Sequence, residues 1–204
     1  ASQSAGVLNV DLEGWGAAFV AMPGHKGLYG PQGTGLLLCA GEAQPLIFGG
    51  TGSLSARQEM PAFLPDRLEA GTHNVCGAAG LLAGMRFVSR TGTARIHRHE
   101  RCLAGRMMDR LACVPGVTVF RGGEEQSGLC SVVVDGMDCE DLGEALAQRG
   151  VAVRAGLHCA PLAHRTAGTQ DTGTVRFSFS AFNRPDQVDR VAAIVRELAG
   201  AAKS

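Results

Sequence analysis

A glycine-rich run lies between two short apolar segments near the start of the chain. It covers residues 23–35 and reads Pro-Gly-His-Lys-Gly-Leu-Tyr-Gly-Pro-Gln-Gly-Thr-Gly. The flanking segments, residues 17–22 and 36–39, predict buried strands because they are short, continuous and apolar. The chain is therefore expected to form two core strands joined by a loop. The glycines of that loop would let backbone N–H groups approach an anion closely.

Lys26 lies in this loop and is one of only two lysines; the other is Lys203. Because Lys and Arg total 19, the remaining 17 are arginines. A lysine amine can lose its proton and attack a carbonyl, whereas a guanidinium stays charged. We therefore predict that Lys26 reacts with a carbonyl group; the alternative is an ordinary loop lysine.

The rest of the pattern predicts an α/β segment followed by a compact α+β unit. Helices are expected over residues 74–89, 93–112, 138–149 and 185–199, and strands over residues 117–120, 131–134, 151–153 and 175–179, with a loop between the last two strands. Residues 46–71 are rich in Gly, Pro and Ser and predict long loops. We place the boundary near Gly92, which gives domains of residues 1–92 and 93–204.

Composition excludes several functional classes. The formal net charge is zero and the pI about 7.2, so no basic field favours nucleic acid or an anionic membrane. No apolar stretch is long enough to span a bilayer. The first six residues look like a strand end and a turn, so the chain is expected to begin within a larger fold.

Seven cysteines are scattered along the chain without a C-x-x-C pair. This pattern argues against a disulfide framework and a structural zinc site, and it favours a reducing compartment. We expect a soluble cytoplasmic protein in which most cysteines are small buried hydrophobes. His97 and His99 lie among arginines and are expected on a solvated helix face, so no metal site is predicted.

Cys159 is the cysteine expected to differ from the others. It lies in residues 154–161, Arg-Ala-Gly-Leu-His-Cys-Ala-Pro, where small neighbours leave the thiol accessible. Arg154, His158 and His164 could lower the thiol pKa from about 8.5 towards neutrality. A catalytic Cys–His dyad is less favoured, because adjacent residues in an extended loop point apart and His158 need not face the sulfur.

Arg176 is a charged residue in the middle of an apolar strand, Thr-Val-Arg-Phe-Ser. Burying an unpaired guanidinium is costly, so Arg176 is expected to have an anionic partner. A substrate carboxylate held bidentately would serve, and so would a structural ion pair with an acidic residue of the chain.

Five segments, taken in order, resemble motifs of the class V, fold type I pyridoxal-phosphate enzymes, and within that family the cysteine desulfurases and selenocysteine lyases. They are residues 2–6 (Ser-Gln-Ser-Ala-Gly), 24–33 (Gly-His-Lys, then Gly-Pro-Gln-Gly), 69–74 (Glu-Ala-Gly-Thr-His-Asn), 154–161, and 175–178 (Val-Arg-Phe-Ser) with Phe-Asn at 182–183. The resemblance runs along essentially the whole chain. It implies that residues 1–92 are the C-terminal part of the family's large cofactor-binding domain, lacking the N-terminal half. Residues 93–204 would be the small α+β domain that carries the cysteine loop.

The resemblance assigns four residues to the cofactor, pyridoxal 5'-phosphate. It implies that Lys26 binds the cofactor covalently, that His25 contacts its phosphate and that Gln3 hydrogen-bonds the phenolic oxygen of its ring. Thr72 would reach the phosphate of the cofactor in a neighbouring subunit, which implies a homodimer.

The resemblance assigns three further residues to the substrate. It implies that Arg176 holds the carboxylate of L-cysteine, that Arg154 lines the pocket and that Cys159 accepts the sulfur. The implied reaction converts L-cysteine to L-alanine and leaves a persulfide on Cys159, which is passed to an acceptor protein. Three alternatives stay open: another class V aminotransferase, a selenocysteine lyase acting on L-selenocysteine, or an inactive half-enzyme.

Two departures from the family pattern concern the cofactor. Pro23 stands where the family has a Ser or Thr that binds phosphate, and proline offers neither a hydroxyl nor an N–H group. The Asp that pairs with the pyridinium nitrogen in the family would come immediately before Ala1. Chemistry by this chain alone is therefore expected to be slow or absent unless the N-terminal half is supplied.

Overall fold

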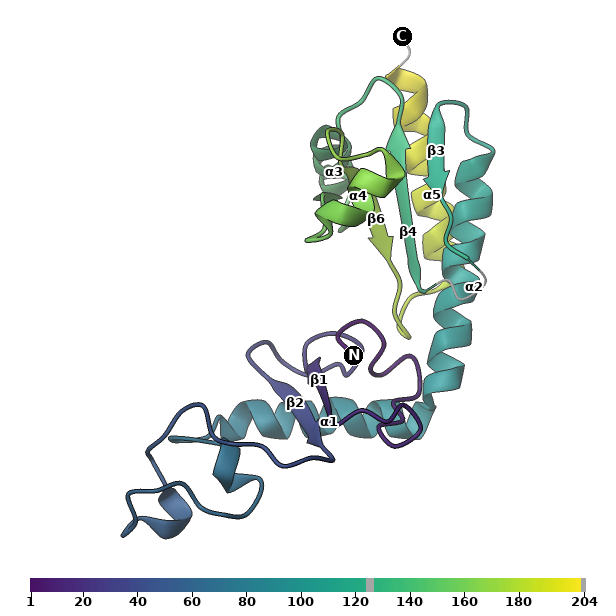
Figure 1. The fold of residues 1–204 in the computed structure, drawn as a ribbon. Helices are drawn as coiled ribbons and strands as arrows, with labels where there is room; N and C mark the ends of the chain where they lie inside the picture. Colours follow the sequence, from purple (N-terminus) through teal and green to yellow (C-terminus); the bar gives the residue numbers. More distant parts are fainter. Residues whose placement is uncertain (124–126, 203–204) are drawn as a thin grey trace. The chain divides into compact units, whose positions relative to one another are not determined.

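The computed structural model describes residues 1–123 and 127–202, and Lys203 lies outside them. The chain forms two compact units, unit 1 (Ala1–Ala94) and unit 2 (Arg95–Ser204). Both contain helices and strands (Figure 1). Each unit has its own hydrophobic core.

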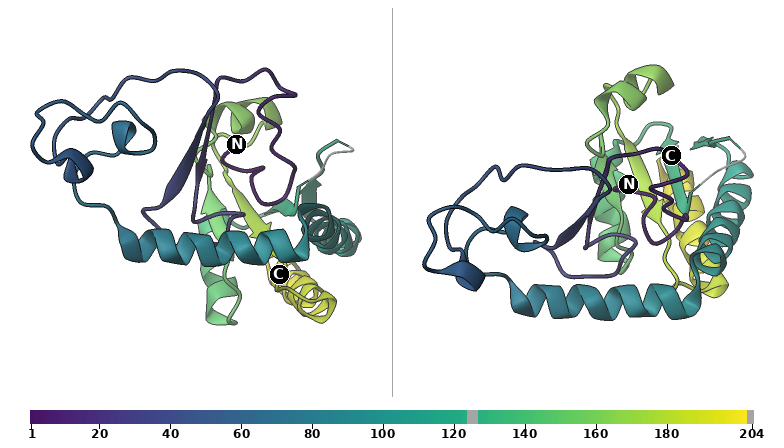
Figure 2. Two further views of the ribbon diagram at one scale, coloured as in Figure 1. Left: turned by 90° about the horizontal axis from the view of Figure 1, so that it is seen from below. Right: turned by 60° about the horizontal axis from the view of Figure 1, so that its bottom comes forward.

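Unit 1 is a two-stranded ribbon followed by loops and a long helix. Strands β1 (Phe19–Pro23) and β2 (Gly35–Cys39) pair antiparallel, with Phe19 opposite Cys39 and Pro23 opposite Gly35. The predicted long loops contain two short 3-10 turns, η1 (Gly52–Leu54) and η2 (Asp66–Leu68). Helix α1 (Val75–Thr91) lies beside the ribbon (Figure 2). It begins where the Asn74 side chain accepts a hydrogen bond from the Gly77 N–H.

The core of unit 1 is small. Its buried residues come from the N-terminal segment, β1, the following loop and α1: Ala5, Val20, Met22, Leu28 and Leu81. The prediction that both strands are buried is wrong in part, because Leu37 is 51% exposed and Phe19 43%. Only alternate residues of β1 are buried, as expected for a ribbon that is covered on one face.

Unit 2 is an α+β sandwich around a four-stranded antiparallel sheet of order β3-β4-β6-β5. Its elements are α2 (Thr93–Ala112), β3 (Val117–Phe120), β4 (Leu129–Val134), α3 (Cys139–Gln148), β5 (Arg154–Gly156), α4 (Pro161–Ala167), β6 (Thr174–Ser178) and α5 (Pro185–Ala201). Asp138 precedes α3 and caps it, because its carboxylate accepts a hydrogen bond from the Glu140 N–H, and α5 starts with Pro185 in its first turn.

The two faces of this sheet differ in character. Alternate residues of β4 and β6, among them Cys130, Val132, Val175 and Phe177, are buried in a core with residues of α2, α3 and α5. Arg176 alternates with Val175 and Phe177 along β6, so it lies on the other face. Figure 1 shows α4 and α5 on opposite sides of the sheet. The alternation explains how a charged residue fits an apolar strand: it faces away from the core.

Two local predictions in unit 2 are wrong. Residues 151–153 are not a strand; pairing with β6 begins only at Arg154, opposite Arg176. The expected loop after β5 contains helix α4, which begins at Pro161 and ends at Ala167, and Gly168 follows it with a left-handed φ of 70°. Proline at a helix start and glycine just past its end are signals that could have found it.

The cysteines are all free, as predicted, but most are not buried. Only Cys130 and Cys139 are buried, whereas Cys76, Cys102, Cys113 and Cys159 are exposed. Among residues 1–123 and 127–202, no helix is long and apolar enough to cross a membrane.

Candidate functional site

Lys26 lies at the tip of the loop that connects β1 to β2 in unit 1. The loop is closed by backbone hydrogen bonds: the Gly24 N–H donates to the Thr34 carbonyl at 2.8 Å, and the Gly30 N–H donates to the Gly24 carbonyl at 2.7 Å. A further bond of 2.9 Å joins the Tyr29 N–H to the Lys26 carbonyl. Lys26 and His25 are both exposed. The Lys26 amine and the His25 imidazole are therefore both exposed on a turn whose backbone is held by hydrogen bonds.

The glycines around Lys26 are required by close packing. A Cβ on Gly27 would overlap the carbonyl oxygen of Ala5, and a Cβ on Gly6 would overlap the carbonyl oxygen of Gly27. The N-terminal segment is thus pressed against the lysine turn, and its terminal amine donates to the Ala21 carbonyl at 2.9 Å. Gln3 is exposed on this same segment.

These features fit a cofactor that carries a carbonyl and a phosphate. An exposed lysine amine can condense with an aldehyde, and an imidazole and an amide beside it can donate hydrogen bonds to anionic oxygens. A side chain on Gly6 or Gly27 would occupy the space in which the N-terminal segment and the lysine turn approach each other. Pro23 ends β1 and has no N–H to offer at that position.

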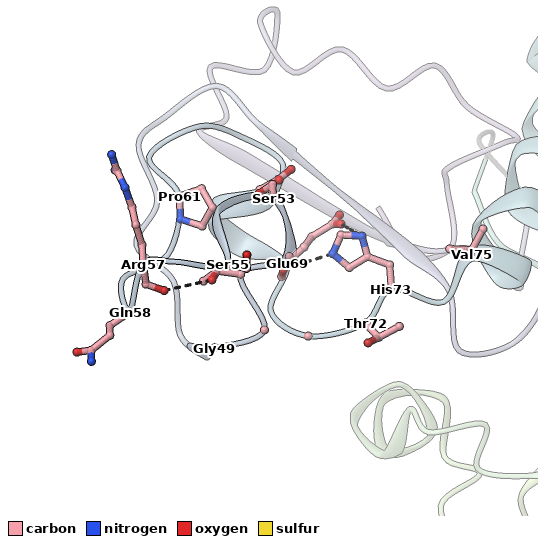
Figure 3. Close-up of a pocket in the computed structure, with 15 residues that line it drawn as sticks. Gly49, Ser53, Ser55, Arg57, Gln58, Pro61, Glu69, Thr72, His73 and Val75 are labelled. Atoms are coloured by element: carbon pink, nitrogen blue, oxygen red, sulfur yellow. Dashed lines mark hydrogen bonds and ion pairs between the residues drawn. The ribbon is translucent and has the colours of Figure 1, made fainter.

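Thr72 lies in a different part of unit 1. It lines an open cavity of about 890 Å³ between two loop stretches, residues 49–61 and 66–75 (Figure 3). In that cavity His73 Nδ1 lies 3.4 Å from a carboxylate oxygen of Glu69. Lys26, His25 and Gln3 do not line it. Unit 1 therefore places His25 and Lys26 on one turn, against which the N-terminal segment carrying Gln3 packs. Thr72 also lines a second cavity, together with Gly33, Thr34 and Gly35 of the lysine loop.

Unit 2 holds the second group of predicted residues, on the sheet face away from the core. The pairing of β5 with β6 sets Arg154 directly opposite Arg176. The Nη2 group of Arg154 also lies 3.6 Å from the Sγ atom of Cys159, which is exposed. Sequence reasoning named these three residues, but only the register of the strands shows that the two guanidinium groups are neighbours.

Among residues 1–123 and 127–202, no acidic side chain forms an ion pair with either arginine. None of the ion pairs formed by the described residues includes Arg154 or Arg176, and the buried Nε atom of Arg176 has no hydrogen-bond partner among those residues. Burial lowers the pKa of Arg176, and the nearby Arg154 charge lowers it further. The structural ion pair considered for Arg176 is therefore wrong for the described part of the chain. Two adjacent guanidinium groups without an acidic partner among the described residues could bind an anion, such as a carboxylate.

His158 does not form a dyad with Cys159. Its Nε2 atom lies 2.9 Å from the hydroxyl of Thr174, and its ring lies against that of His164 at 5.5 Å between centroids. Burial lowers the pKa of His158 to about 4, with smaller contributions from Arg176, His164 and Arg154. His158 is therefore uncharged near neutral pH and does not act as a cation beside the thiol. Arg154 is the cation in contact with the sulfur.

The backbone at the cysteine is in an unusual conformation. His158 and Cys159 have φ values of 53° and 59°, consecutive left-handed residues of which neither is glycine. For such residues this conformation costs roughly 1–2 kcal/mol each. The Ala160 N–H closes the turn on the Leu157 carbonyl at 2.9 Å. Nothing in the residue types predicts this turn, because left-handed positions usually carry Gly or Asn.

The histidines of α2 are not part of a cluster of metal-ligand residues within the described part of the chain. No group of three or more His, Cys, Asp or Glu residues there is arranged to hold a metal ion. The Nε2 atom of His99 lies 2.9 Å from the Asn183 carbonyl, so this histidine joins α2 to the start of α5.

Comparison with known proteins identifies the family to which this chain is similar. Residues 1–191 match the family model described as aminotransferase class-V. The chain is 33% identical over 98% of its length to a protein of Methanothermobacter thermautotrophicus that is named a probable cysteine desulfurase. It covers 52% of that protein.

Two solved structures are also similar. One is the apo structure of cysteine desulfurase from Thermococcus onnurineus NA1, with a TM-score of 0.86, 33% identity, and coverage of 98% of this chain and 52% of that one. The other is the cysteine desulfurase CsdA of Escherichia coli, with a TM-score of 0.83, 31% identity, and coverage of 97% and 50%. The chain therefore spans about half the length of each of these relatives.

Proposed function

The chain belongs to the class V aminotransferase family, and on this premise we propose that it supplies the C-terminal part of a pyridoxal-phosphate-dependent cysteine desulfurase. The family resemblance drawn from the five motifs is confirmed, and so is the fold that it implied. The reaction would convert L-cysteine to L-alanine and leave the sulfur on Cys159.

In unit 1, we assign the binding of pyridoxal 5'-phosphate to Lys26, His25 and Gln3. The bound cofactor supplies a ring that accepts electrons from the substrate. Lys26 would hold the cofactor through Nζ; once released by the substrate, the same Nζ would take the proton from the substrate α-carbon. His25 would donate to the phosphate and Gln3 to the phenolic oxygen. The exposure of Lys26 and His25 on a preformed turn supports these roles.

In unit 2, we assign the substrate carboxylate to Arg176, with Arg154 lining the same pocket. The supporting observation is the unpartnered, buried Nε atom of Arg176 opposite a second guanidinium. A carboxylate bound here would supply the missing acceptor and offset the repulsion between the two cations. This pair of arginines carries the proposal, because it favours an amino-acid substrate over an uncharged one.

Cys159 would act as the sulfur acceptor. Its thiolate attacks the sulfur of L-cysteine, an S–S bond forms, and the substrate C–S bond breaks. The substrate carbon leaves as the methyl group of alanine after it takes up a proton, and the transferred sulfur stays on Cys159 as a persulfide. The exposed thiol in contact with Arg154 supports this role.

We also propose the assembly and setting expected from the sequence. Thr72 would contact the cofactor phosphate of a second subunit in a homodimer, and its exposed position in an open cavity is compatible with that role. A sulfur-acceptor protein would take the persulfide. A reducing compartment such as the cytoplasm would keep Cys159 as a free thiol.

The first experiment modifies the lysine directly. The chain is incubated with pyridoxal phosphate, reduced with borohydride and mapped by peptide mass spectrometry. Modification is expected on Lys26 and not on Lys203, and the Lys26→Arg variant serves as the control. Equal modification of both lysines would contradict the assignment of Lys26.

A second experiment tests the sulfur step. Incubation with L-cysteine should produce alanine and a persulfide on the Cys159 peptide, and Cys159→Ser should abolish both. Undiminished alanine production by the Cys159→Ser variant would favour another class V aminotransferase or lyase. A preference for L-selenocysteine would favour a selenocysteine lyase.

A further inference from the structure

A series of side-chain contacts joins the Cys159 loop to the body of unit 2 through His158. The Nε2 atom of His158 lies 2.9 Å from the hydroxyl of Thr174, a residue of β6 that is only 3% exposed. The His158 ring also lies 5.5 Å from the ring of His164 on α4. His164 is itself buried and held by Thr169, whose hydroxyl lies 2.8 Å from Nδ1. The residue next to the reactive cysteine is therefore attached to both the sheet and a helix.

The contact with the Thr174 hydroxyl is the only side-chain hydrogen bond of the His158 ring within the described residues, and the ring also interacts with the Thr174 backbone. A neutral imidazole has one donor and one acceptor nitrogen. Nε2 is used by Thr174, and the buried Nδ1 has no partner among residues 1–123 and 127–202. Removing the Thr174 hydroxyl would leave the ring with only its polar interaction with the Thr174 backbone.

The backbone of His158 and Cys159 needs such support. Both residues are left-handed without being glycine, and residues in this conformation persist only when their surroundings hold them. The position of the sulfur 3.6 Å from Arg154 depends on this turn. We propose that His158 is a positioning residue, whose contacts with Thr174 and His164 hold the Cys159 loop in the turn that sets the sulfur beside the two arginines. This proposal rests on the proposed function only in that the function assigns a reaction to the Cys159 sulfur; the position of the sulfur does not depend on it.

The test measures where the sulfur lies, not how fast the enzyme works. Cys159 of the chain is alkylated separately with iodoacetate, which is anionic, and with iodoacetamide, which is neutral. The ratio of the two rates cancels the intrinsic reactivity of the thiol and reports the local positive potential. Beside Arg154 and Arg176 the ratio should be raised at low ionic strength. Cys113, exposed at the far end of α2, provides the reference within the same molecule.

Two variants of Thr174 form a matched pair. Thr174→Val removes the hydroxyl at nearly constant volume, and Thr174→Ser keeps it. We expect Thr174→Ser to retain the wild-type ratio at Cys159 and Thr174→Val to lower it by about two- to fivefold, the size of the field of two nearby cations in water. The ratio at Cys113 should stay the same in both.

Cys130, which is buried, reports whether each variant is folded, because it should remain unlabelled. If Thr174→Val exposes Cys130, the variant His158→Ala decides instead, and its ratio should fall by the same factor. An unchanged ratio in the folded variant that lacks the contact overturns the proposal. Because alkylation needs no cofactor, a failure of Lys26 modification or of alanine production would overturn the proposed function and leave this measurement standing.

Discussion

Replacing Arg154 by Gln should make unit 2 more stable, although Arg154 is assigned to the substrate pocket. Arg154 and Arg176 are directly opposite on β5 and β6, and like charges in that position destabilise a sheet. Two charges about 6 Å apart repel by about 0.7 kcal/mol in water and about 1.4 kcal/mol at half the dielectric constant of water. Because Arg154 is exposed, we expect a gain near the lower figure, about 0.5–1 kcal/mol.

Urea unfolding followed by far-ultraviolet circular dichroism measures this gain, and hydrogen exchange of the β4 and β6 amides assigns it to unit 2. In 1 M salt the Debye length is about 3 Å, so the difference from wild type should largely vanish. The control is Arg184→Gln, because Arg184 is paired with Asp186 at 2.8 Å and its removal should give no gain. A loss of stability in Arg154→Gln, or a gain that salt does not reduce, would refute the idea of an uncompensated arginine pair.

Three other predictions follow from particular residues. The pKa of His158 is lowered from 6.5 to about 4, so between these values the unfolded chain binds more protons than the folded chain. The free energy of unfolding should therefore fall as the pH drops through this window. Urea unfolding measured at several pH values should show a smaller loss in His158→Gln than in wild type. Gly27→Ala should destabilise unit 1 by about 1–3 kcal/mol, because the new Cβ overlaps the Ala5 carbonyl. Gly105→Ala lies in open space on α2 and should stabilise the chain by about 0.5–1 kcal/mol. Thermal unfolding of the two variants compares these effects. Burial raises the pKa of Cys130 to about 12, so iodoacetamide should label it only when the chain unfolds, and labelling at the rate of the exposed Cys113 would contradict its burial.

Most of the secondary structure could be predicted from the sequence, because local patterns determine it. Helix α2 has the bounds that its apolar periodicity predicted, residues 93–112. Strand β5 was misplaced because residues 151–153 are as apolar as a strand, although only residues 154–156 pair with β6. Hydrophobic periodicity is a property of one segment, whereas strand pairing depends on two segments, so periodicity alone does not predict it.

The candidate site could be predicted in part. Lys26, Cys159 and Arg176 stood out as residue types in unusual surroundings. The opposition of Arg154 and Arg176 depends on strand register, and the left-handed turn at His158 and Cys159 depends on contacts with β6 and α4. Both features arise from residues that are far apart in the sequence, so no local sequence pattern predicts them.

The register of β5 against β6 also limits how this chain can vary. Side chains alternate between the faces of a strand, so a one-residue insertion or deletion that shifted β5 by one position would turn Arg154 towards the hydrophobic core. The connection from residue 157 to residue 173 runs between the paired strands, and its length does not fix their register. Changes in length in that connection should therefore leave the register of β5 and β6 unchanged, whereas changes between Val151 and Gly156 should be rejected.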